Sequence, residues 1–173
     1  MLKPRYYFAD DFHRFYEYFQ TQPHTKRHFS KGEYLWKPGQ PYDRIQYYVS
    51  GASMHFSDHK SGYRKIISFH GPGTILPGYH TTDFHIELSL TTIAISDIKV
   101  IEFTIPQFKA MFDSNPELAN SVVNWYSKYV NRFLFETIHQ DFNSLQVKLC
   151  NLLYLLTMNQ PANSGLVIEM TQV

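Results

Sequence analysis

The most constraining feature of this sequence is a change in its hydrophobic period. Over residues 28–103, short segments rich in Tyr, Ile, Val, Phe and Thr alternate with glycine-containing turns, whereas residues 117–139 contain neither glycine nor proline. Closely spaced turns with no helix between them are typical of an antiparallel sandwich or barrel, and a long uninterrupted stretch is typical of a helix. We therefore predict a mainly β centre with flanking helices.

The segments between these turns have the length and composition of β-strands. They cover residues 44–49, 52–57, 65–69, 88–96 and 99–103.

Residues 5–20 carry an aromatic pattern that fits one side of a helix. The aromatic residues are Phe8, Phe12, Phe15, Tyr16 and Phe19. Pro23 would end such a helix, because proline lacks the amide hydrogen that a helix interior needs. We predict that residues 1–27 form a docking segment whose short amphipathic helix packs on the core.

The composition limits the possible functions. The 173 residues are 43% hydrophobic, enough for one globular core plus an extension, and 17% aromatic, which indicates that some rings line an interface or a pocket. A net charge of +1 gives this segment no electrostatic basis for binding nucleic acid by itself. Cys150 is the only cysteine, which excludes an internal disulfide and a Cys-based zinc site and fits the cytoplasm. There is neither a signal-peptide pattern nor an apolar stretch long enough to span a membrane, so no membrane partner is expected.

A long helix is predicted to start at Asn115-Pro116, a capping residue followed by proline. Its apolar residues form two stripes. The first has the spacing of a coiled-coil seam and consists of Ala119, Val122, Tyr126, Tyr129 and Phe133. The second consists of Leu118, Val123, Val130, Leu134 and Ile138. One stripe can pack on the β core while the other meets a partner. We predict a homodimer through the first stripe, and a helix buried wholly in its own subunit is the alternative.

Residues 141–173 have the pattern of a further helix, a loop and a strand. Residues 159–165 are rich in Pro, Gly, Asn and Ser, and residues 166–170 predict a strand. The helix is indicated by the spacing of Leu145, Leu149, Leu152, Leu153 and Leu156. Because these elements have an apolar face but no second layer to cover it, we expect an incomplete domain.

An ordered set of short motifs resembles the CRP/FNR family of bacterial transcription regulators. The motifs are Lys31-Gly32-Glu33, Gly39, Tyr47-Tyr48-Val49-Ser50-Gly51, Gly62, Gly71-Pro72-Gly73 and Phe108 through Asn115-Pro116. Residues 28–113 resemble the family's cyclic-nucleotide-binding sensor domain, residues 114–140 its dimerisation helix, and residues 141–173 the start of its winged helix-turn-helix domain. The resemblance implies a double-stranded β-helix (jelly-roll) barrel followed by a long dimerisation helix.

The resemblance also implies a function. This chain would be the effector-sensing and dimerising part of a regulator that controls DNA binding allosterically, with an unknown small-molecule effector bound in the barrel against the long helix. DNA would be bound only through the missing C-terminal helix-turn-helix, and RNA polymerase is implied as a partner of the full-length protein. A stand-alone small-molecule-binding β-barrel module without DNA-binding activity is the alternative.

The loop after residue 71 argues against cyclic AMP as the effector. In the cyclic-AMP-binding members this loop supplies a glutamate to the ribose and an arginine to the phosphate. Aligned without gaps from Gly73, this sequence has Gly78 and Leu88 at those positions and keeps only the following serine, Ser89. Residues 72–97 contain no Arg or Lys, so a buried phosphate would lack a countercharge.

The pocket that remains is predicted to be apolar with a few polar groups. Phe133 and Leu134 occupy the positions of the polar pair that contacts the purine in the family. The candidate effector pocket consists of Leu76, Gly78, Tyr79, His80, Leu88, Ser89, Tyr129, Phe133 and Leu134. Such a lining suits a small, weakly charged, aromatic effector. The alternative is a cavity filled by its own side chains.

No metal site, cofactor or catalytic motif is predicted. The pairs His24/His28 and His55/His59 fall on a predicted loop and turn, so we interpret these histidines as solvated or singly hydrogen-bonded. The sequence contains no His-x-His pair and no Ser/His/Asp, Walker or Rossmann motif. We therefore do not expect an enzyme.

Overall fold

The computed structural model of this chain describes residues 6–80 and 89–157. They belong to two compact units, Arg5–Tyr129 and the part from Val130 onward, which divide within the long helix α3 (Pro116–Phe142). The first half of α3 therefore belongs to the same unit as the strands. Within the described ranges, no helix is both long and apolar enough to cross a membrane.

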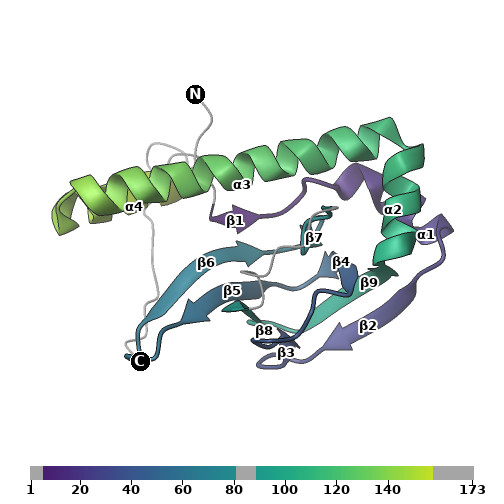
Figure 1. Cartoon of the computed structure of the whole chain (residues 1–173), viewed down its shortest axis with the longest axis horizontal. Coiled ribbons are helices and arrows are strands. Elements are labelled where there is room, and N and C mark those ends of the chain that lie inside the picture. The colour runs from purple at the N-terminus through teal and green to yellow at the C-terminus, as the bar shows by residue number, and fades with distance from the viewer. Residues whose placement is uncertain (1–5, 81–88, 158–173) are drawn as a thin grey trace. The chain divides into compact units, whose positions relative to one another are not determined.

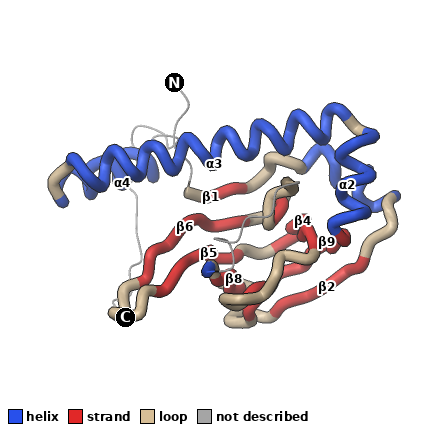
Figure 2. The backbone as a smooth tube through the Cα atoms, viewed as in Figure 1, coloured by secondary structure: helices blue, strands red, loops and turns tan. Residues whose placement is uncertain are grey.

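The strands of the first unit form two sheets (Figure 2). The five-stranded sheet has the order β1-β6-β5-β8-β3, and the four-stranded sheet has the order β2-β9-β4-β7. Only the pairing of β1 with β6 is parallel among the described strands. The strands are β1 (Tyr7–Phe8), β2 (Thr25–Phe29), β3 (Tyr34–Trp36), β4 (Arg44–Ser50), β5 (Ser53–Asp58), β6 (Arg64–His70), β7 (Ile75–Leu76), β8 (Thr91–Ala94) and β9 (Ile98–Thr104). The predicted mainly β fold with flanking helices is confirmed and is of the jelly-roll type, although the described strands do not close into a barrel.

Helices of the first unit come before and after most of the strands. The short elements η1 (His13–Phe15) and α1 (Tyr16–Thr21) precede β2, whereas α2 (Ile105–Ser114) and α3 follow β9 (Figure 1). Helix α2 begins with a capping box, in which Thr104 and Gln107 each accept a hydrogen bond from the other's backbone amide. Asn115 Oδ1 accepts from the amides of Glu117 and Leu118, at 3.1 Å in both cases, which confirms the predicted start of α3.

Two hydrophobic cores lie on the two faces of the four-stranded sheet. Successive residues of β4 alternate between them, so that Tyr47 packs with the helices and Tyr48 packs between the sheets. The helix-side core includes Phe12, Phe19, Phe103, Phe108, Leu118, Val122 and Trp125. The inter-sheet core includes Phe29, Leu35, Trp36, Leu76, Ala94, Ile98 and Val100. Strand alternation thus fixes which side chains face α3 and which face the other sheet.

The helix predicted over residues 5–20 is wrong in its first half, where strand β1 runs parallel to β6. Beyond β1, the Asp10 amide donates to the Pro72 carbonyl at 2.9 Å and the Phe12 amide donates to the Gly73 carbonyl at 2.7 Å. These backbone hydrogen bonds to the segment after β6 override the helical pattern, which records only the spacing of buried side chains. The aromatic residues Phe8, Phe12, Phe15 and Phe19 are nevertheless all buried in the helix-side core.

The strands predicted at 44–49, 52–57, 65–69 and 99–103 correspond to β4, β5, β6 and β9 within one residue at each end. The segment 88–96 contains β8, and its residue 88 lies outside the described residues, as does the strand predicted at 166–170. Strands β2, β3 and β7 were not predicted. In β2 only Phe29 is buried, because β2 is an edge strand of its sheet, so the alternation that marks a strand is absent.

The second unit is helical in its described residues. It contains α3 from Val130 onward and α4 (Leu145–Thr157), which confirms the further helix predicted from the leucine spacing. Its exposed large apolar side chains include Val130, Phe133, Leu134, Ile138, Phe142, Leu145, Leu149, Leu152 and Leu153. Arg132, by contrast, is only 1% exposed, and its guanidinium carbon lies 4.2 Å from the centre of the Phe133 ring. This unit thus presents many apolar side chains at its surface.

Candidate functional site

A group of polar side chains lies inside the first unit. The β5–β6 hairpin supplies four of them, because Ser53 is paired with His70 and His55 with Ser68, which places all four on one face of the hairpin. Strands β4 and β8 and helix α3 supply one side chain each. We call this group the interior polar cluster, and it consists of Tyr48, Ser53, His55, Ser68, His70, Thr92 and Tyr129.

Two hydrogen-bonded pairs of the cluster join neighbouring strands and sheets. Tyr48 Oη lies 2.8 Å from Ser53 Oγ and links the four-stranded sheet to the five-stranded one. His55 Nδ1 lies 2.7 Å from Thr92 Oγ1, across the β5–β8 pairing. Burial raises the pKa of Tyr48, so its hydroxyl stays protonated at neutral pH. These pairs satisfy polar groups that would otherwise be costly to bury.

Tyr129 connects α3 to the interior polar cluster. Its hydroxyl lies 2.5 Å from Ser68 Oγ, and its ring stacks on Phe8 with 4.6 Å between the ring centroids. The imidazole of His70 lies nearly parallel to the Tyr129 ring, with 6.4 Å between centroids, and 5.9 Å from the imidazole of His55. Helix α3 therefore touches the cluster through a hydroxyl group and a stacked aromatic ring.

The chemistry of the cluster is that of hydroxyls and imidazoles, without arginine, lysine or carboxylate side chains. A hydroxyl both donates and accepts hydrogen bonds, and an imidazole nitrogen takes either role according to its tautomer. Histidine is also the side chain whose charge changes most readily near neutral pH. Such groups suit a neutral or weakly acidic ligand, whereas a phosphate requires a permanent cation beside it.

Of the predicted effector-pocket residues, Tyr129 is the one that belongs to this cluster. Leu76 is buried in the inter-sheet core. Tyr79 is buried in the helix-side core, where its ring lies 5.4 Å from that of Phe108 and 5.0 Å from that of Phe112. Both side chains therefore fill core space, which agrees for these two positions with the alternative of a cavity filled by its own side chains.

Gly78 lies in close contact with α3. A Cβ atom at this position would be 2.5 Å from the Trp125 ring and 2.6 Å from the Tyr126 hydroxyl, closer than van der Waals contact allows. The Trp125 indole is itself held by a hydrogen bond from Nε1 to Thr74 Oγ1 at 3.2 Å. Position 78 therefore has no room for a side chain unless α3 or its aromatic residues move.

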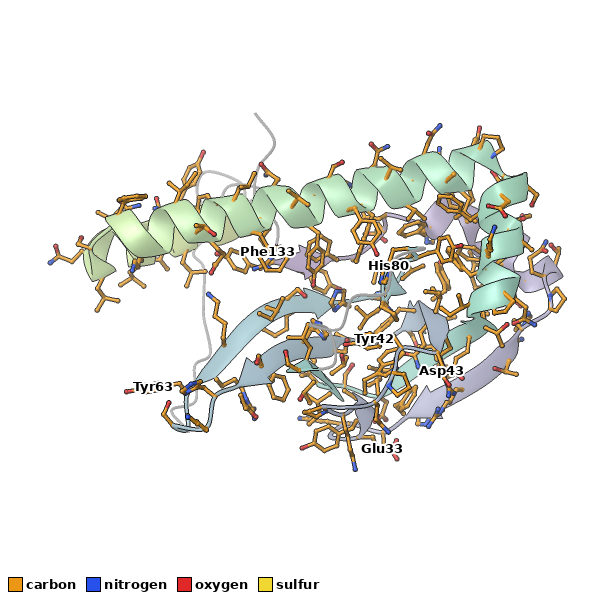
Figure 3. The ribbon with its side chains drawn as sticks, in the orientation of Figure 1. Glu33, Tyr42, Asp43, Tyr63, His80 and Phe133 are labelled. Carbon is orange, nitrogen blue, oxygen red and sulfur yellow. The ribbon has the colours of Figure 1, made fainter. Side chains whose placement is uncertain are left out.

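The other predicted pocket residues are spread over the molecule. His80 is half-buried and follows β7 (Figure 3), and Ser89 is exposed. Leu88 lies outside the described residues. Phe133 and Leu134 belong to the second unit, where both side chains are exposed.

The predicted dimer stripe is divided between buried and exposed positions. Val122 is only 2% exposed within the helix-side core, and Tyr126 and Tyr129 pack against the same core. This face of α3 therefore packs in the core of its own unit, and the dimer interface predicted from the sequence stays a prediction. Ala119 is half-buried and Phe133 is exposed. In the second stripe Leu118 is buried, whereas the exposed members are Val123, Val130, Leu134 and Ile138.

The sequence reasoning missed His55, Ser68 and His70 as a group. A signal was present: in a hairpin centred on the Ser61-Gly62 turn, positions 53 and 55 face positions 70 and 68. Polar residues at all four positions indicate one polar face of a two-stranded ribbon. Pairing His55 with His59 along the sequence hid this arrangement. No group of three or more potential metal ligands occurs in the part of the chain that the structure describes.

Comparison with protein families gives one match that spans the sensor region. The family model for the cyclic nucleotide-binding domain matches residues 26–115, which run from β2 to the end of α2. Comparison with curated protein sequences gives no significant match.

Solved structures share the fold at low sequence identity. CprK in complex with OCPA has a TM-score of 0.71 at 16% identity, with 88% of this chain and 67% of that chain covered. A CooA mutant from Carboxydothermus hydrogenoformans has a TM-score of 0.68 at 16% identity, with coverage of 84% and 61%. The c-di-GMP-responsive global regulator CLP from Xanthomonas campestris has a TM-score of 0.65 at 12% identity, with coverage of 79% and 69%. The matched region spans about two thirds of the length of each of these proteins.

Proposed function

This chain belongs to the cyclic nucleotide-binding domain family, and from that premise we propose that it is the effector-sensing and dimerising part of a CRP/FNR-type transcription regulator. The family and the proteins of similar fold are regulatory binding proteins, so the role of this chain is one of binding. The order of its elements, a sensor domain followed directly by one long helix, supports a regulator in which a ligand acts on that helix.

The effector of this regulator is not cyclic AMP. In the cyclic-AMP-binding members of the family, the residue at position 78 is a glutamate that bonds the ribose, and here Trp125 and Tyr126 leave no room for one. The interior polar cluster also lacks the arginine or lysine that would balance a buried phosphate. Both ends of a cyclic nucleotide would therefore lose their partners.

The observation that carries the proposal is the hydrogen bond between Ser68 and Tyr129, which joins the β5–β6 hairpin to α3. A ligand that bonds Ser68 competes with this contact, and a ligand with an aromatic ring can stack against Phe8 and Tyr129. Either event changes the free energy of the contact between the hairpin and α3. Binding at the interior polar cluster is thereby coupled to the helix.

The chemistry of the cluster favours an aromatic effector that is neutral or weakly acidic. Its hydroxyls and imidazoles can bond a phenol or a carboxylic acid, and the neighbouring rings of Phe8, Trp125 and Tyr129 supply an apolar wall. A complex of CprK with o-chlorophenolacetic acid, an aromatic acid, has a similar fold with a TM-score of 0.62. This similarity supports the same class of ligand here.

The second unit would carry the effect of ligand binding to dimerisation and DNA binding. We assign dimerisation to the exposed apolar stripe of α3, because Val130, Leu134 and Ile138 lie one above another at four-residue spacing on the helix surface. DNA binding would require a helix-turn-helix domain, of which α4 would be the first helix. The resulting dimer would place two such domains on neighbouring half-sites of DNA.

A thermal-shift screen tests the proposed effector class. The panel contains substituted phenols, quinones and phenylacetic acids, with cyclic AMP as the comparison ligand. At a concentration 100-fold above its dissociation constant, a ligand stabilises the folded state by about 2.7 kcal/mol, which raises the melting temperature measurably. We expect at least one aromatic ligand to do so and cyclic AMP to have no effect at about 1 mM.

Variants then locate the ligand. Ser68→Ala is expected to remove at least half of the ligand-induced shift, because it removes the hydroxyl that the ligand bonds. Tyr129→Phe is expected to increase the shift, because it removes the hydroxyl that competes with the ligand for Ser68. The matched controls Ser57→Ala and Tyr63→Phe, on the outer part of the same hairpin, should keep the full shift. A shift that survives Ser68→Ala, a shift that Tyr129→Phe reduces, or a shift produced by cyclic AMP would contradict the proposal.

A further inference from the structure

A cavity lies at one end of the four-stranded sheet, close to the start of α2. Its volume is about 280 Å³, and none of its lining residues belongs to the interior polar cluster. Asp43, one of the lining residues, directly precedes β4 and is labelled in Figure 3. The cavity is lined by Thr25, Asp43, Arg44, Glu102, Phe103, Thr104 and Gln107.

The charged side chains of this cavity are already paired with one another. Arg44 forms two parallel hydrogen bonds to Asp43, from Nε at 2.7 Å and from Nη2 at 2.9 Å. This bonding lowers the pKa of Asp43 and raises that of Arg44. Glu102 has Arg27 at 3.8 Å and Arg44 at 3.6 Å, beyond hydrogen-bond distance but near enough to balance its charge. A ligand of this cavity therefore needs no net charge.

In contrast to the paired charges, some polar atoms of the lining residues make no hydrogen bond to another described residue. Thr104 and Gln107 bond one another in the capping box of α2, which leaves the Gln107 amide nitrogen as a donor. Glu102 Oε1 accepts from Gln46 Nε2 at 2.6 Å, whereas the nearest cation to Oε2 is Arg44 at 3.6 Å. Glu102 lines the cavity and is only 7% exposed, and no hydrogen bond joins its Oε2 to a donor among the described residues.

Thr25 provides the complementary group. It stands directly opposite Glu102 in the pairing of β2 with β9, so the two side chains lie on the same face of the sheet. Its hydroxyl makes no hydrogen bond to any described residue, and it lines the same cavity. The cavity therefore presents an acceptor, Glu102 Oε2, beside a hydroxyl donor, Thr25 Oγ1.

We propose that this cavity binds a small neutral ligand through a cis-amide edge, that is, a primary carboxamide or a lactam. In such a group an N–H donor and a carbonyl acceptor point in the same direction. The N–H would donate to Glu102 Oε2, and the carbonyl would accept from the Thr25 hydroxyl and the Gln107 amide. The ligand supplies hydrogen-bond partners that these groups do not have among the described residues. The cavity is somewhat smaller than the roughly 300–1,000 Å³ of pockets for drug-sized molecules, so the ligand is the size of a fragment.

The ligand also contacts the capping box at the start of α2. Gln107 is the residue whose side chain closes that box, and α2 leads through Asn115 into α3. Occupancy of the cavity therefore stabilises the start of α2, at a place separate from the interior polar cluster.

An NMR titration of the full chain tests this proposal. The probes are 2-piperidone and nicotinamide, and their N-methylated forms, 1-methyl-2-piperidone and N,N-dimethylnicotinamide, serve as matched ligands without the N–H donor. We expect the two N–H probes to shift the amide signals of Thr25 and Glu102 in a saturable way, with dissociation constants of about 1 mM. The N-methylated forms should bind at least about fivefold more weakly, because they leave Glu102 Oε2 without a donor.

Variants separate the site from unspecific binding. Thr25→Val keeps the shape of an exposed strand residue and should weaken binding about fivefold, whereas the control Thr21→Val, at the end of α1, should leave it unchanged. Glu102→Gln, which keeps the contact with Gln46, is the second test variant and should weaken the N–H probes. Equal binding of N–H and N-methylated probes, no saturable shift up to about 10 mM, or equal effects of Thr25→Val and Thr21→Val would overturn the proposal.

Discussion

The two halves of α3 carry similar apolar side chains in opposite environments. Before Val130, Leu118, Val122 and Trp125 are buried in the helix-side core of the first unit. From Val130 onward, Leu134 and Ile138 are 58% and 54% exposed. The difference teaches that the spacing of apolar residues along a helix indicates which side chains tend to be buried, but not which part of the molecule or which partner buries them. The first half is covered by the strands of its own unit, and the second is available to a partner.

The largest expected difference between the two halves of α3 is in how much a substitution lowers the free energy of unfolding. Trp125→Ala removes a buried ring that packs on Tyr129 and bonds Thr74, so we expect a loss of about 3–5 kcal/mol in the free energy of unfolding. Leu134→Ala removes an exposed side chain and should cost less than about 0.5 kcal/mol in the monomer. Urea unfolding, followed by circular dichroism at low protein concentration, measures both. Similar losses in the two variants would remove the contrast between the halves.

For dimerisation we expect the reverse, with the larger effect from a substitution in the second half of α3. Leu134→Glu places a charge in the exposed stripe, and we expect the dimer dissociation constant to rise about 100-fold, or about 2.7 kcal/mol. Sedimentation velocity over a concentration series measures this change. Asn124→Glu, an exposed position in the first half of α3, is the control and should leave the dimer intact. A wild-type chain that stays monomeric at about 50 µM would contradict dimerisation through this stripe.

The smallest expected effect is on how the free energy of unfolding decreases at alkaline pH. Burial raises the pKa of Tyr48, and that of Tyr47 to about 12, whereas an unfolded tyrosine ionises near pH 10. Above about pH 10 the unfolded state therefore binds fewer protons than the folded state, and stability falls by up to about 1.4 kcal/mol per pH unit for each such tyrosine. Tyr48→Phe should reduce this slope. Tyr154→Phe, at an exposed position in the second unit, should not change it, and equal slopes in both variants would refute the assignment.

The parts of the fold that follow local rules could be predicted. Gly51 and Gly62 have φ angles of 82° and 88°, a conformation that other residues rarely adopt, so the glycine spacing marks real turns and delimits the strands. Asn115 caps α3 for an equally local reason. The resemblance to CRP/FNR regulators, drawn from the same glycines, is confirmed by the family match and the shared fold.

Features that depend on distant contacts could not be predicted in the same way. Strand β1 exists because the backbone near Tyr7 pairs with β6, some sixty residues later, and no local pattern records that pairing. The interior polar cluster depends on the register of β5 against β6, which brings His55 and His70 together. A histidine inside a strand looks the same in sequence whether it faces water or the core.

The contact between Gly78 and Trp125 has an evolutionary consequence. If an ancestor bound cyclic nucleotides through a glutamate at this position, restoring that residue alone would be unfavourable, because the indole fills the space it needs. A smaller residue at position 125 would have to come first, yet that change by itself would leave a hole in the helix-side core. The two positions are therefore epistatic: neither single step is neutral, so a return to the older ligand would require paired substitutions.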